Sequence, residues 1–427
     1  MKSLPPADVP DVSRTLTRIA ITGLGMVTPM GLDCDSSWQG LLTGRGAARW
    51  LEQDFPDLSN SCGASVPWKS ENAGRLVPFA RRAAAEAILQ SGLTSTLLQP
   101  ACCVIGTSKI DMPFFDSFAR SDGTSTGDMS LMDVVSPASA ATAVAKDWGC
   151  EGGTLCPVAA CATGLVSILR GADLIRSGTC STAIVGSSDA ALHRGLLASY
   201  RRLGVHARPD DDPATACRPF DRDRTGFVVG EGAACLVLEE WEQAQSRGAP
   251  ILAEFLSGRI GSDPTGLTRV DSGGEVLVHI VSQLLNEWNL TPNDISCVSL
   301  HGTATRLNDE AEAIALMKLF GERSSLLPAF GIKGAIGHLM GAAGSVETAA
   351  SVLCLQHQTV LPTCNHREPD QKLAVSLSPE PRQTPLTRIL KLSLGFGGHI
   401  AAALIQTPSF SSTREMGQWQ SRGLSLY

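Results

Sequence analysis

One cysteine and its neighbours have the residue types of a reactive thiol site. Cys161 lies in VAACATGLVSI (residues 158–168), among small residues and directly before an apolar helical pattern. A helix N-terminus favours a thiolate, and the small neighbours let a substrate carbonyl approach the sulfur. Position alone is equally consistent with a buried structural thiol. A nucleophile also needs a partner base or hydrogen-bond donor.

Two histidines could supply that partner. His301 lies in SLHGTAT, where an apolar strand gives way to a Gly/Thr loop, and His338 lies in the Gly-rich loop GIKGAIGHLMGAAG. Layered α/β proteins place their sites at such strand and loop ends. A lone histidine is more often structural, but two of them together with a corner cysteine favour a site. The remaining histidines lack this context and are expected to be structural or on the surface: His193, His206, His279, His357, His366 and His399.

The elements that must position these residues alternate along the chain. Helical periodicity predicts helices over residues 77–93, 138–149, 163–176, 274–290, 309–321 and 344–358. Apolar runs predict strands within 18–31, 101–108, 182–191, 232–240 and 295–305, and a strand–turn–strand pair over 389–406. Such alternation indicates a layered α/β architecture. The loop over 205–219 is polar and is expected to be exposed.

Composition excludes several classes of protein. The 427 residues are 43% hydrophobic and 18% charged, with a net charge of −7 and no basic run, which argues against nucleic acid as the main partner. The 13 cysteines are scattered without a CxxC pair, which argues against a disulfide framework or a zinc site and fits the cytoplasm. No secretory signal is visible, and no apolar run approaches the ~20 residues of a membrane span.

The motif GFGG (395–398) could be taken for a nucleotide loop. No helix with the G-x-G-x-x-G pattern follows it, so that interpretation is weak. A turn that exposes backbone N–H groups as an oxyanion hole is a better physical use of these residues.

Several motifs occur together in a recognisable order: TGLGMVTPMG (22–31), ACATG (160–164), RPFDRDRTGFVVGEGA (218–233), HGTATRLNDEAE (301–312), KGAIGHLMGAAGSVE (333–347), PTCNHREPD (362–370) and LGFGGH (394–399). From about Arg18 to Gln406 the chain resembles the elongating β-ketoacyl–acyl-carrier-protein synthases, condensing enzymes of the thiolase-like superfamily. The resemblance implies an α/β thiolase-like fold of two similar αβαβα halves with pseudo-twofold duplication. Its expected parts are a flexible arm (1–17), a half with the nucleophile (18–245), a half with both histidines (246–407) and a flexible tail (408–427).

The resemblance also implies a decarboxylating Claisen condensation that gives a 3-oxoacyl product. Cys161 would take the acyl chain as a thioester, while His301 and His338 would promote decarboxylation of the malonyl unit and stabilise the enolate. Backbone N–H groups of Cys161 and Phe396 would form the oxyanion hole, and the Phe396 ring would gate between the acyl and malonyl pockets. The supporting residues are a buried lysine near the histidines, two acids that organise the loops, and two threonines that bind the phosphopantetheine arm: Lys333, Asp309, Glu347, Thr303 and Thr305.

The implied partners follow from this chemistry. An acyl carrier protein would deliver the acyl and malonyl thioesters, and because phosphopantetheine arrives on the carrier, no metal and no soluble cofactor are implied. A C2 homodimer is expected, with a strand and loops near Cys161 at the interface. The basic residues suggested for carrier docking are Lys69, Arg75, Arg202 and Arg208.

Some positions depart from the family pattern. Where the family has Asn-Ser-Phe before GFGG and Thr-Asn after it, this chain has Leu-Ser-Leu (392–394) and His399-Ile400. Gly334 follows Lys333 where serine is usual. These changes predict an altered pocket and gating loop, and a specialised fatty-acid or polyketide pathway rather than a housekeeping role. The sequence does not reveal the length or saturation of the acyl chain.

Two other functions deserve weighing. A catalytically silent chain-length partner would dimerise with an active synthase, but such partners lose the nucleophile, and Cys161 is present. A degradative thiolase acting on coenzyme A esters would carry a second cysteine in place of one histidine, and this chain has two histidines.

Overall fold

The computed structural model describes residues 17–52, 61–69, 74–120, 136–208 and 211–409. The expected flexible arm (1–17) lies outside these residues except for Thr17, and the expected tail (408–427) lies outside them except for 408–409. All 13 cysteines are described, and each is a free thiol.

Ten strands are hydrogen-bonded in one continuous order, and that order is symmetric about its centre. It runs β10 (Ala329–Phe330), β9 (Cys297–Ser299), β13 (Arg388–Gly395), β14 (His399–Gln406), β8 (Ala253–Ser262), β1 (Ile19–Val27), β7 (Gly232–Glu240), β6 (Thr182–Asp189), β4 (Cys102–Gly106), β5 (Thr154–Leu155). Outwards from β1 and from β8 the pairings repeat: antiparallel, antiparallel, parallel, parallel. This repeated topology is the duplication that the resemblance implies.

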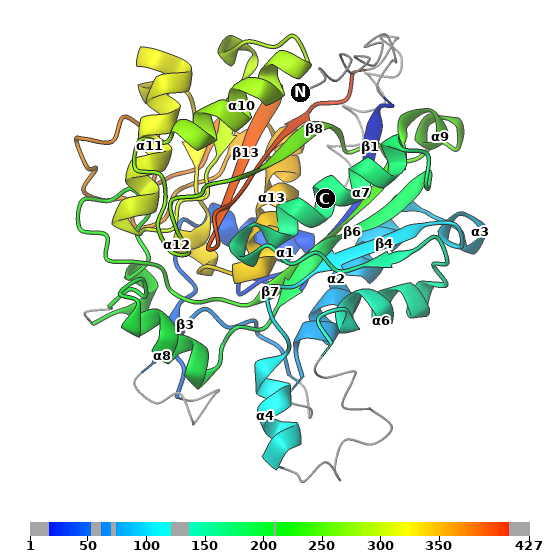
Figure 1. The fold of residues 1–427 in the computed structure, drawn as a ribbon, viewed down its shortest axis with the longest axis horizontal. Helices are drawn as coiled ribbons and strands as arrows, with labels where there is room; N and C mark the ends of the chain where they lie inside the picture. Colours follow the sequence, from blue (N-terminus) through cyan, green and yellow to red (C-terminus); the bar gives the residue numbers. More distant parts are fainter. Residues whose placement is uncertain (1–16, 53–60, 70–73, 121–135, 209–210, 410–427) are drawn as a thin grey trace, which may run out of the picture.

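Helices form three layers around the two half-sheets. Helices α2 (Leu76–Ser91) and α6 (Ser139–Trp148) cover one outer face, and α10 (Glu275–Glu287) and α11 (Arg306–Phe320) cover the other. Between the half-sheets α7 (Thr163–Arg176) packs against α13 (Ala343–His357), and each contacts strands of both halves (Figure 1). The chain is therefore an αβαβα sandwich, the thiolase-like architecture expected from the sequence.

The two central helices are deeply buried, α13 over nearly its whole length and α7 on all sides but the one that carries Arg170 and Asp173. Every residue of α13 from Ala343 to Leu355 is buried. Glycines allow the close approach of α7: a Cβ on Gly164 would lie 2.4 Å from the amide nitrogen of Ser345, and one on Gly171 would lie 2.1 Å from Cγ1 of Val185. The packing of α7 on α13 and on β6 thus depends on these two positions.

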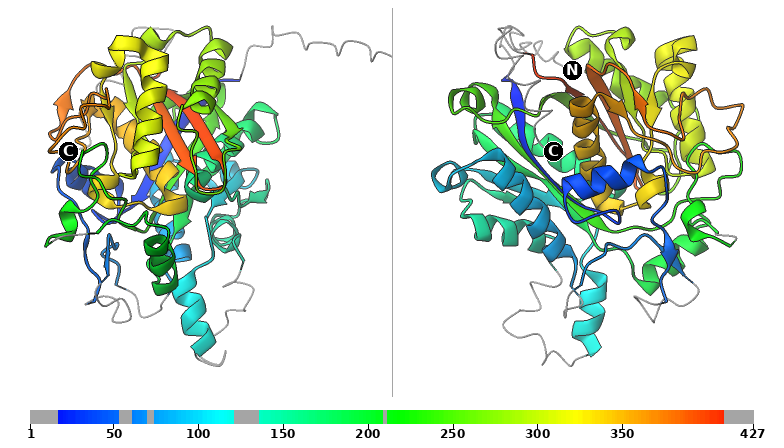
Figure 2. Two further views of the ribbon diagram at one scale, coloured as in Figure 1. Left: turned by 60° about the vertical axis from the view of Figure 1, so that its left-hand side comes forward. Right: turned by 180° about the vertical axis from the view of Figure 1, so that it is seen from behind.

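Shorter elements connect the layers: α1 (Cys34–Leu42), α3 (Ser95–Leu98), α4 (Met112–Arg120), α8 (Arg194–Arg202), α9 (Trp241–Ser246), α12 (Lys333–Ile336), and the paired strands β2 (Arg49–Trp50) with β3 (Cys62–Gly63) and β11 (Thr359–Val360) with β12 (Arg382–Gln383). Helix α4 projects from the body in every view (Figure 2). Within the described ranges, the helices all fall short of the length and apolar character that crossing a membrane requires.

The six helices predicted from periodicity are all present, α7 with the predicted ends and the others with ends that shift by one to three residues. Strand β8 was not predicted, although it joins the two half-sheets through its pairing with β1. The expectation of an exposed loop over 205–219 is wrong in part. His206, Ala207, Ala216 and Cys217 are buried there, because this loop packs against the nucleophile's surroundings.

Candidate active site

The cysteine lies on a strained turn that is repeated in the second half. Ala160 has φ 47° and Met340 has φ 49°, a left-handed conformation that non-glycine residues rarely adopt. Each begins a three-residue 3₁₀ turn, Ala160–Ala162 and Met340–Ala342, that leads directly into α7 or α13. The two turns contact one another. Duplication therefore brings the N-termini of the two central helices together, with Cys161 on one of them.

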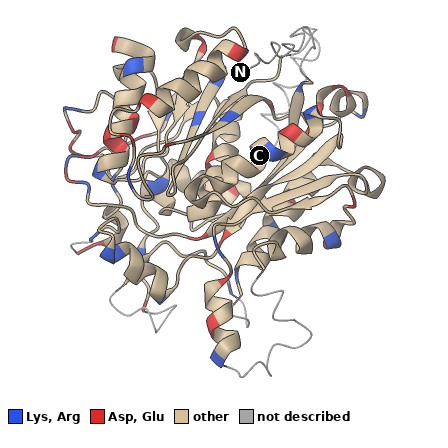
Figure 3. Cartoon of the chain, viewed as in Figure 1, with Lys and Arg blue, Asp and Glu red and all other residues tan. Residues whose placement is uncertain are grey.

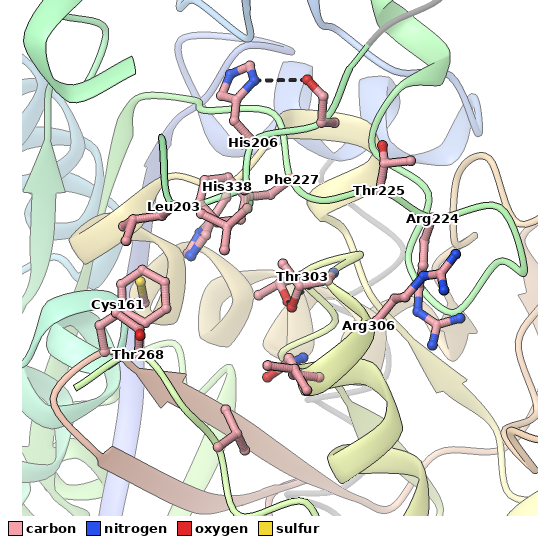
Figure 4. A pocket seen from close by; sticks show the side chains of 18 of the residues that line it. Cys161, Leu203, His206, Arg224, Thr225, Phe227, Thr268, Thr303, Arg306 and His338 are labelled. Carbon is pink, nitrogen blue, oxygen red and sulfur yellow. Dashed lines mark hydrogen bonds between the residues drawn. The ribbon is translucent and has the colours of Figure 1, made fainter. Parts of the chain in front are cut away.

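A cavity of about 870 Å³ opens onto this turn. It is lined by Cys161, His301 and His338, and also by Phe396, so the predicted trio and the predicted gate share one space. Figure 4 shows Cys161, His338 and Thr303 around it. The hydroxyls of Thr303 and Thr305, which lie 2.8 Å apart, also line the wall. Such a volume is typical of pockets for small organic ligands.

The hydrogen bonds of His301 fix which ring nitrogen carries its proton. Lys333 Nζ lies 3.3 Å from His301 Nδ1 and also donates to the backbone carbonyl of His301. An ammonium can only donate, so Nδ1 must accept and Nε2 must carry the proton. The backbone N–H groups of His301 and Gly302 each donate to the buried carboxylate of Glu312 at 2.7 Å, which holds the loop after β9 in place.

His338 is held in the same tautomer by a different partner. The backbone N–H of Met340 donates to His338 Nδ1 at 3.3 Å, so its Nε2 also carries a proton. The backbone of His338 pairs with residues 228 and 230, and the Phe227 ring meets the imidazole edge-on at a centroid distance of 5.0 Å. The two imidazole centroids are 5.5 Å apart. The cavity therefore has two neutral N–H donors side by side.

Both imidazoles stay neutral because charging them is unfavourable. Burial lowers the pKa of His301 well below 6.5, and the positive charge of Lys333 lowers it further. The pKa of His338 is lowered in the same direction, by burial first and then by Lys333 and Lys109. Neutral donors can hold a developing oxyanion without a proton first being taken up.

Burial and nearby charges act on the Cys161 thiol in addition to the helix N-terminus. Burial raises the pKa of Cys161 to about 11. The ammonium groups of Lys109 and Lys333 and a hydrogen bond from the backbone N–H of Phe396 oppose that rise without cancelling it. Desolvation of the sulfur is the largest of these effects. The resting site is therefore a thiol beside two neutral imidazoles.

Behind His301 lies a group of buried charges, only part of which was predicted. Lys333 and Glu347 were expected, and they form an ion pair in which both side chains are buried. A second lysine, Lys391, lies 2.7 Å from the other oxygen of the same carboxylate and is fully buried. The sequence analysis did not predict this role. The available signal was the lone charge inside the apolar run ILKLSLG, because a charged residue within a buried strand is rare unless it is paired.

The predicted acid Asp309 organises a neighbouring loop and does not touch either histidine. It accepts hydrogen bonds from the backbone N–H of Phe220 at 2.8 Å and from Asn308 at 3.1 Å, and the buried guanidinium of Arg224 lies 3.8 Å away. Burial raises the pKa of Asp309 to about 7. Asn308 also bonds to Glu312, so this group connects the start of α11 to the His301 loop.

The residues that depart from the family pattern lie around the turn after β13. Leu392 is buried in the apolar layer under α10 and α11, and Leu394 lines the cavity. His399, which was expected to be structural or on the surface, is half-buried at the start of β14. His206, expected in the same group, is a buried residue of the cavity wall whose Nδ1 lies 2.9 Å from the Ala207 carbonyl oxygen.

Of the four residues suggested for carrier docking, one is engaged inside the protein. Arg75 is bound internally to the buried carboxylate of Glu231, so it does not serve a docking surface. Lys69 and Arg202 are exposed away from the cavity wall, while Arg208 is exposed on it. Two exposed residues that sequence reasoning missed, Arg269 and Arg306, line the same cavity. Figure 3 shows basic positions on α8 and at the start of α11, interspersed with acidic ones.

Metal ligands do not gather at this site. In the parts of the chain that the structure covers, no three His, Cys, Asp or Glu side chains are grouped so that they could hold a metal ion.

Comparison with known proteins gives concordant matches to both halves of the chain. The family model described as "Beta-ketoacyl synthase, N-terminal domain" matches residues 16–244, and the corresponding C-terminal domain matches residues 252–367. The tetracenomycin polyketide synthase ketoacyl synthase alpha subunit of Streptomyces glaucescens is 31% identical over 92% of this chain and 97% of its own length. A 3-oxoacyl-[acyl-carrier-protein] synthase 2 of Coxiella burnetii is 31% identical over 89% of this chain and 96% of its own.

Solved structures agree. The type II polyketide ketosynthase of the AntDE:AntF complex, bound to its acyl-carrier protein and a hexaketide, matches with a TM-score of 0.84 and 26% identity over 92% of this chain and 100% of that one. The ishigamide ketosynthase/chain length factor matches with a TM-score of 0.81 and 27% identity over the same shares.

Proposed function

Because this chain belongs to the β-ketoacyl synthase family and is a condensing acyltransferase, we propose that Cys161, His301 and His338 carry out the condensation. The observation that carries this assignment is the pair of neutral Nε2–H donors that share one cavity with a thiol. A decarboxylating condensation needs this combination: a nucleophile to hold the acyl group and donors to hold an enolate.

The first half-reaction transfers the acyl group to sulfur. The thiol of Cys161 attacks the carbonyl of an acyl thioester, the bond from that carbonyl to the carrier sulfur breaks, and the proton lost by Cys161 ends on the departing carrier thiol. The high pKa of Cys161 leaves little thiolate at neutral pH, so the thiol must lose its proton as it attacks. The product is a Cys161 thioester in the dry region next to Met340 and Phe227.

The second half-reaction makes and uses a carbanion. The malonyl carboxylate leaves as carbon dioxide, and its bonding electrons move onto the thioester carbonyl, whose oxygen accepts hydrogen bonds from the Nε2–H groups of His301 and His338. The enolate carbon then attacks the acyl carbonyl on Cys161. Backbone N–H groups of Cys161 and Phe396 hold the tetrahedral oxyanion until the C–S bond breaks; the Cys161 sulfur leaves as a thiolate and takes up a proton from solvent. Each well-placed donor at such an oxyanion contributes about 3 kcal/mol.

Separate measurement of the two half-reactions tests these roles. We expect Cys161→Ala to lose the acyl-enzyme adduct, read by intact mass, while still decarboxylating a malonyl thioester. We expect His301→Ala and His338→Ala each to slow decarboxylation about 100-fold or more. His279→Ala, at an exposed position on α10, is the matched control and should change neither. If the wild-type protein forms no acyl adduct, the result would favour the silent-partner alternative.

The substrates are proposed to arrive on an acyl carrier protein that docks at the mouth of the cavity. Exposed Arg208, Arg269 and Arg306 give this mouth a positive edge, which suits an acidic carrier and the phosphodiester of its pantetheine arm. Thr303 and Thr305 would hydrogen-bond that arm. We expect Arg269→Glu and Arg306→Glu to raise KM for the carrier-bound substrate about 10-fold while leaving turnover of a free pantetheine thioester unchanged. Arg170→Glu, on α7 and away from the cavity wall, should have no effect on either.

A homodimer joined through β5 is proposed as the working assembly. This strand ends the sheet order, and its Leu155 is 38% exposed, while Val158 is 56% exposed three residues before Cys161. An exposed apolar edge strand is a template for pairing with another copy. In sedimentation velocity, Leu155→Glu with Val158→Asp should give a monomer, whereas Leu326→Asp, at a 75% exposed position elsewhere, should not. A dimer that survives the first pair of changes would refute this interface.

The altered turn after β13 supports a specialised pathway, fatty-acid or polyketide, as the setting. Leu394 changes the cavity wall, Leu392 and His399 lie next to that segment in the chain, and the thiol and the imidazoles remain in place. The thirteen free thiols fit a cytoplasmic location. The product masses obtained with a panel of acyl-carriers would identify the preferred chain.

A further inference from the structure

Lys391 is a charged residue at the centre of the molecule. It lies on β13, between neighbours that are themselves buried, and its side chain is 0% exposed. The same strand leads directly to Gly395 and Phe396 at the cavity. A lysine in such a place is rare unless it is paired.

The partner of Lys391 connects it to the site. Its ammonium donates a hydrogen bond to the Leu392 carbonyl and lies 2.7 Å from Glu347 Oε2, an ion pair with an oxygen that accepts no hydrogen bond among the described residues. The second oxygen of Glu347 accepts from Lys333, which in turn contacts His301 Nδ1. A continuous line of contacts therefore runs from β13 through α13 and α12 to the catalytic imidazole.

The charges around His301 balance only when Lys391 is counted. The groups that face it from the surrounding elements are Lys333 on α12, Lys391 on β13, Glu312 on α11 and Glu347 on α13, together with the neutral ring of His338. Without Lys391, two buried carboxylates would surround one buried ammonium. A buried carboxylate left in excess favours protonation of a neighbouring base.

We propose that Lys391 is a positioning residue of the condensing site: by occupying Glu347 Oε2 it fixes the Lys333 ammonium against His301 Nδ1 and so keeps the Nε2 proton directed into the cavity. The proposal rests on the role given to His301 above. It predicts that the loss of the charge at 391 acts on the imidazole even though Lys391 touches neither substrate nor ring. The positive charge of Lys391 also lowers the pKa of His301, which agrees in direction with this role.

The test compares Lys391→Met with Lys391→Arg. Nitrogen-15 NMR of the histidine rings reports the tautomer and titration of His301, and the pH profile of malonyl-pantetheine decarboxylation reports its effect on the reaction. In Lys391→Met we expect the His301 titration and the acid limb of the profile to move up by about one pH unit. Lys391→Arg keeps the charge and should keep both near their wild-type positions. Lys318→Met, which removes a surface lysine from α11, is the control and should move neither.

The outcomes separate the two proposals. A folded Lys391→Met protein with unchanged titration and profile would overturn the role of Lys391. A wild-type protein that does not decarboxylate would overturn the function of His301, while the NMR titration would still test Lys391. If Lys391→Met does not fold, the wild-type spectrum decides: His301 must carry its proton on Nε2 from pH 6 to 9, and a proton on Nδ1 would end the proposal.

Discussion

The pH dependence of decarboxylation gives a direct measure of how the two imidazoles are held. The perturbation is a change from pH 8.0 to pH 5.5 with malonyl-pantetheine as substrate and Cys161→Ala as enzyme, so that the thiol does not contribute to the profile. The malonyl carboxylate titrates near pH 4 or below and stays ionised over this range. The groups that would titrate next to the substrate are His301 and His338; Asp309, whose pKa burial raises to about 7, touches neither imidazole.

The size of the change in decarboxylation rate distinguishes histidines with the usual pKa from the two histidines of this structure, whose pKa values are lowered. Two independent imidazoles with the usual pKa of 6.5 would both be neutral in only about 1% of molecules at pH 5.5, so the rate would fall roughly 100-fold. Burial and the Lys333 ammonium lower both pKa values well below 6.5. The structure therefore predicts that kcat changes less than about threefold over this interval, and that the acid limb begins only at lower pH.

The assay is release of carbon dioxide at saturating substrate, followed from pH 8.0 to 4.5. His301→Ala with His338→Ala gives the background rate, and circular dichroism at each pH confirms that the protein is folded. A fall of 30-fold or more by pH 5.5 with a two-proton slope would mean that the imidazoles titrate normally. In that case burial and the neighbouring cations do not lower the pKa values of the two imidazoles in solution.

Two further predictions concern the nucleophile and its helix. The ammonium of Lys109, paired with Asp189 at 3.0 Å, lowers the pKa of Cys161, so Lys109→Met should slow iodoacetamide alkylation of Cys161 at pH 8 about 3- to 10-fold, while Lys146→Met on α6 should not. Faster alkylation in Lys109→Met would contradict this electrostatic role. Gly164→Val would drive a side chain into the α13 backbone 2.4 Å away and should lower the free energy of unfolding by at least about 2 kcal/mol, read from urea denaturation. An unchanged midpoint would show that the two helices can separate.

The features that follow local rules were predictable from the sequence. Helix α7 begins and ends at the residues that periodicity indicated, because its apolar positions recur at helical spacing and small residues precede it. Cys161, His301 and His338 were identifiable because each follows an apolar run at a Gly-rich corner. Features of this kind depend on short segments of sequence, so they can be predicted without knowing the fold.

The features that could not be predicted from the sequence depend on contacts between distant segments. Strand β8 has an ordinary polar and apolar mixture, and its place at the centre of the sheet comes from pairing with β1 and β14. Arg75 looked like a surface charge, but Glu231, 156 residues away, binds it. The high pKa of Cys161 likewise comes from burial, which the local sequence does not show.

The duplicated architecture explains why the parts of the site meet. The turns at Ala160 and Met340 are equivalent, so Gly341 is the counterpart of Cys161 in the second half. In the first half this position presents a sulfur to the cavity. In the second half the Gly341 amide donates to the buried carboxylate of Asp189 at 2.9 Å, and a Cβ there would lie 2.5 Å from the Ser108 backbone. The second turn therefore serves as an anchor, and it fixes His338, three residues earlier, opposite the nucleophile. One half of the scaffold holds the acyl group while the other holds the donors, and the contact between α7 and α13 sets the distance between them.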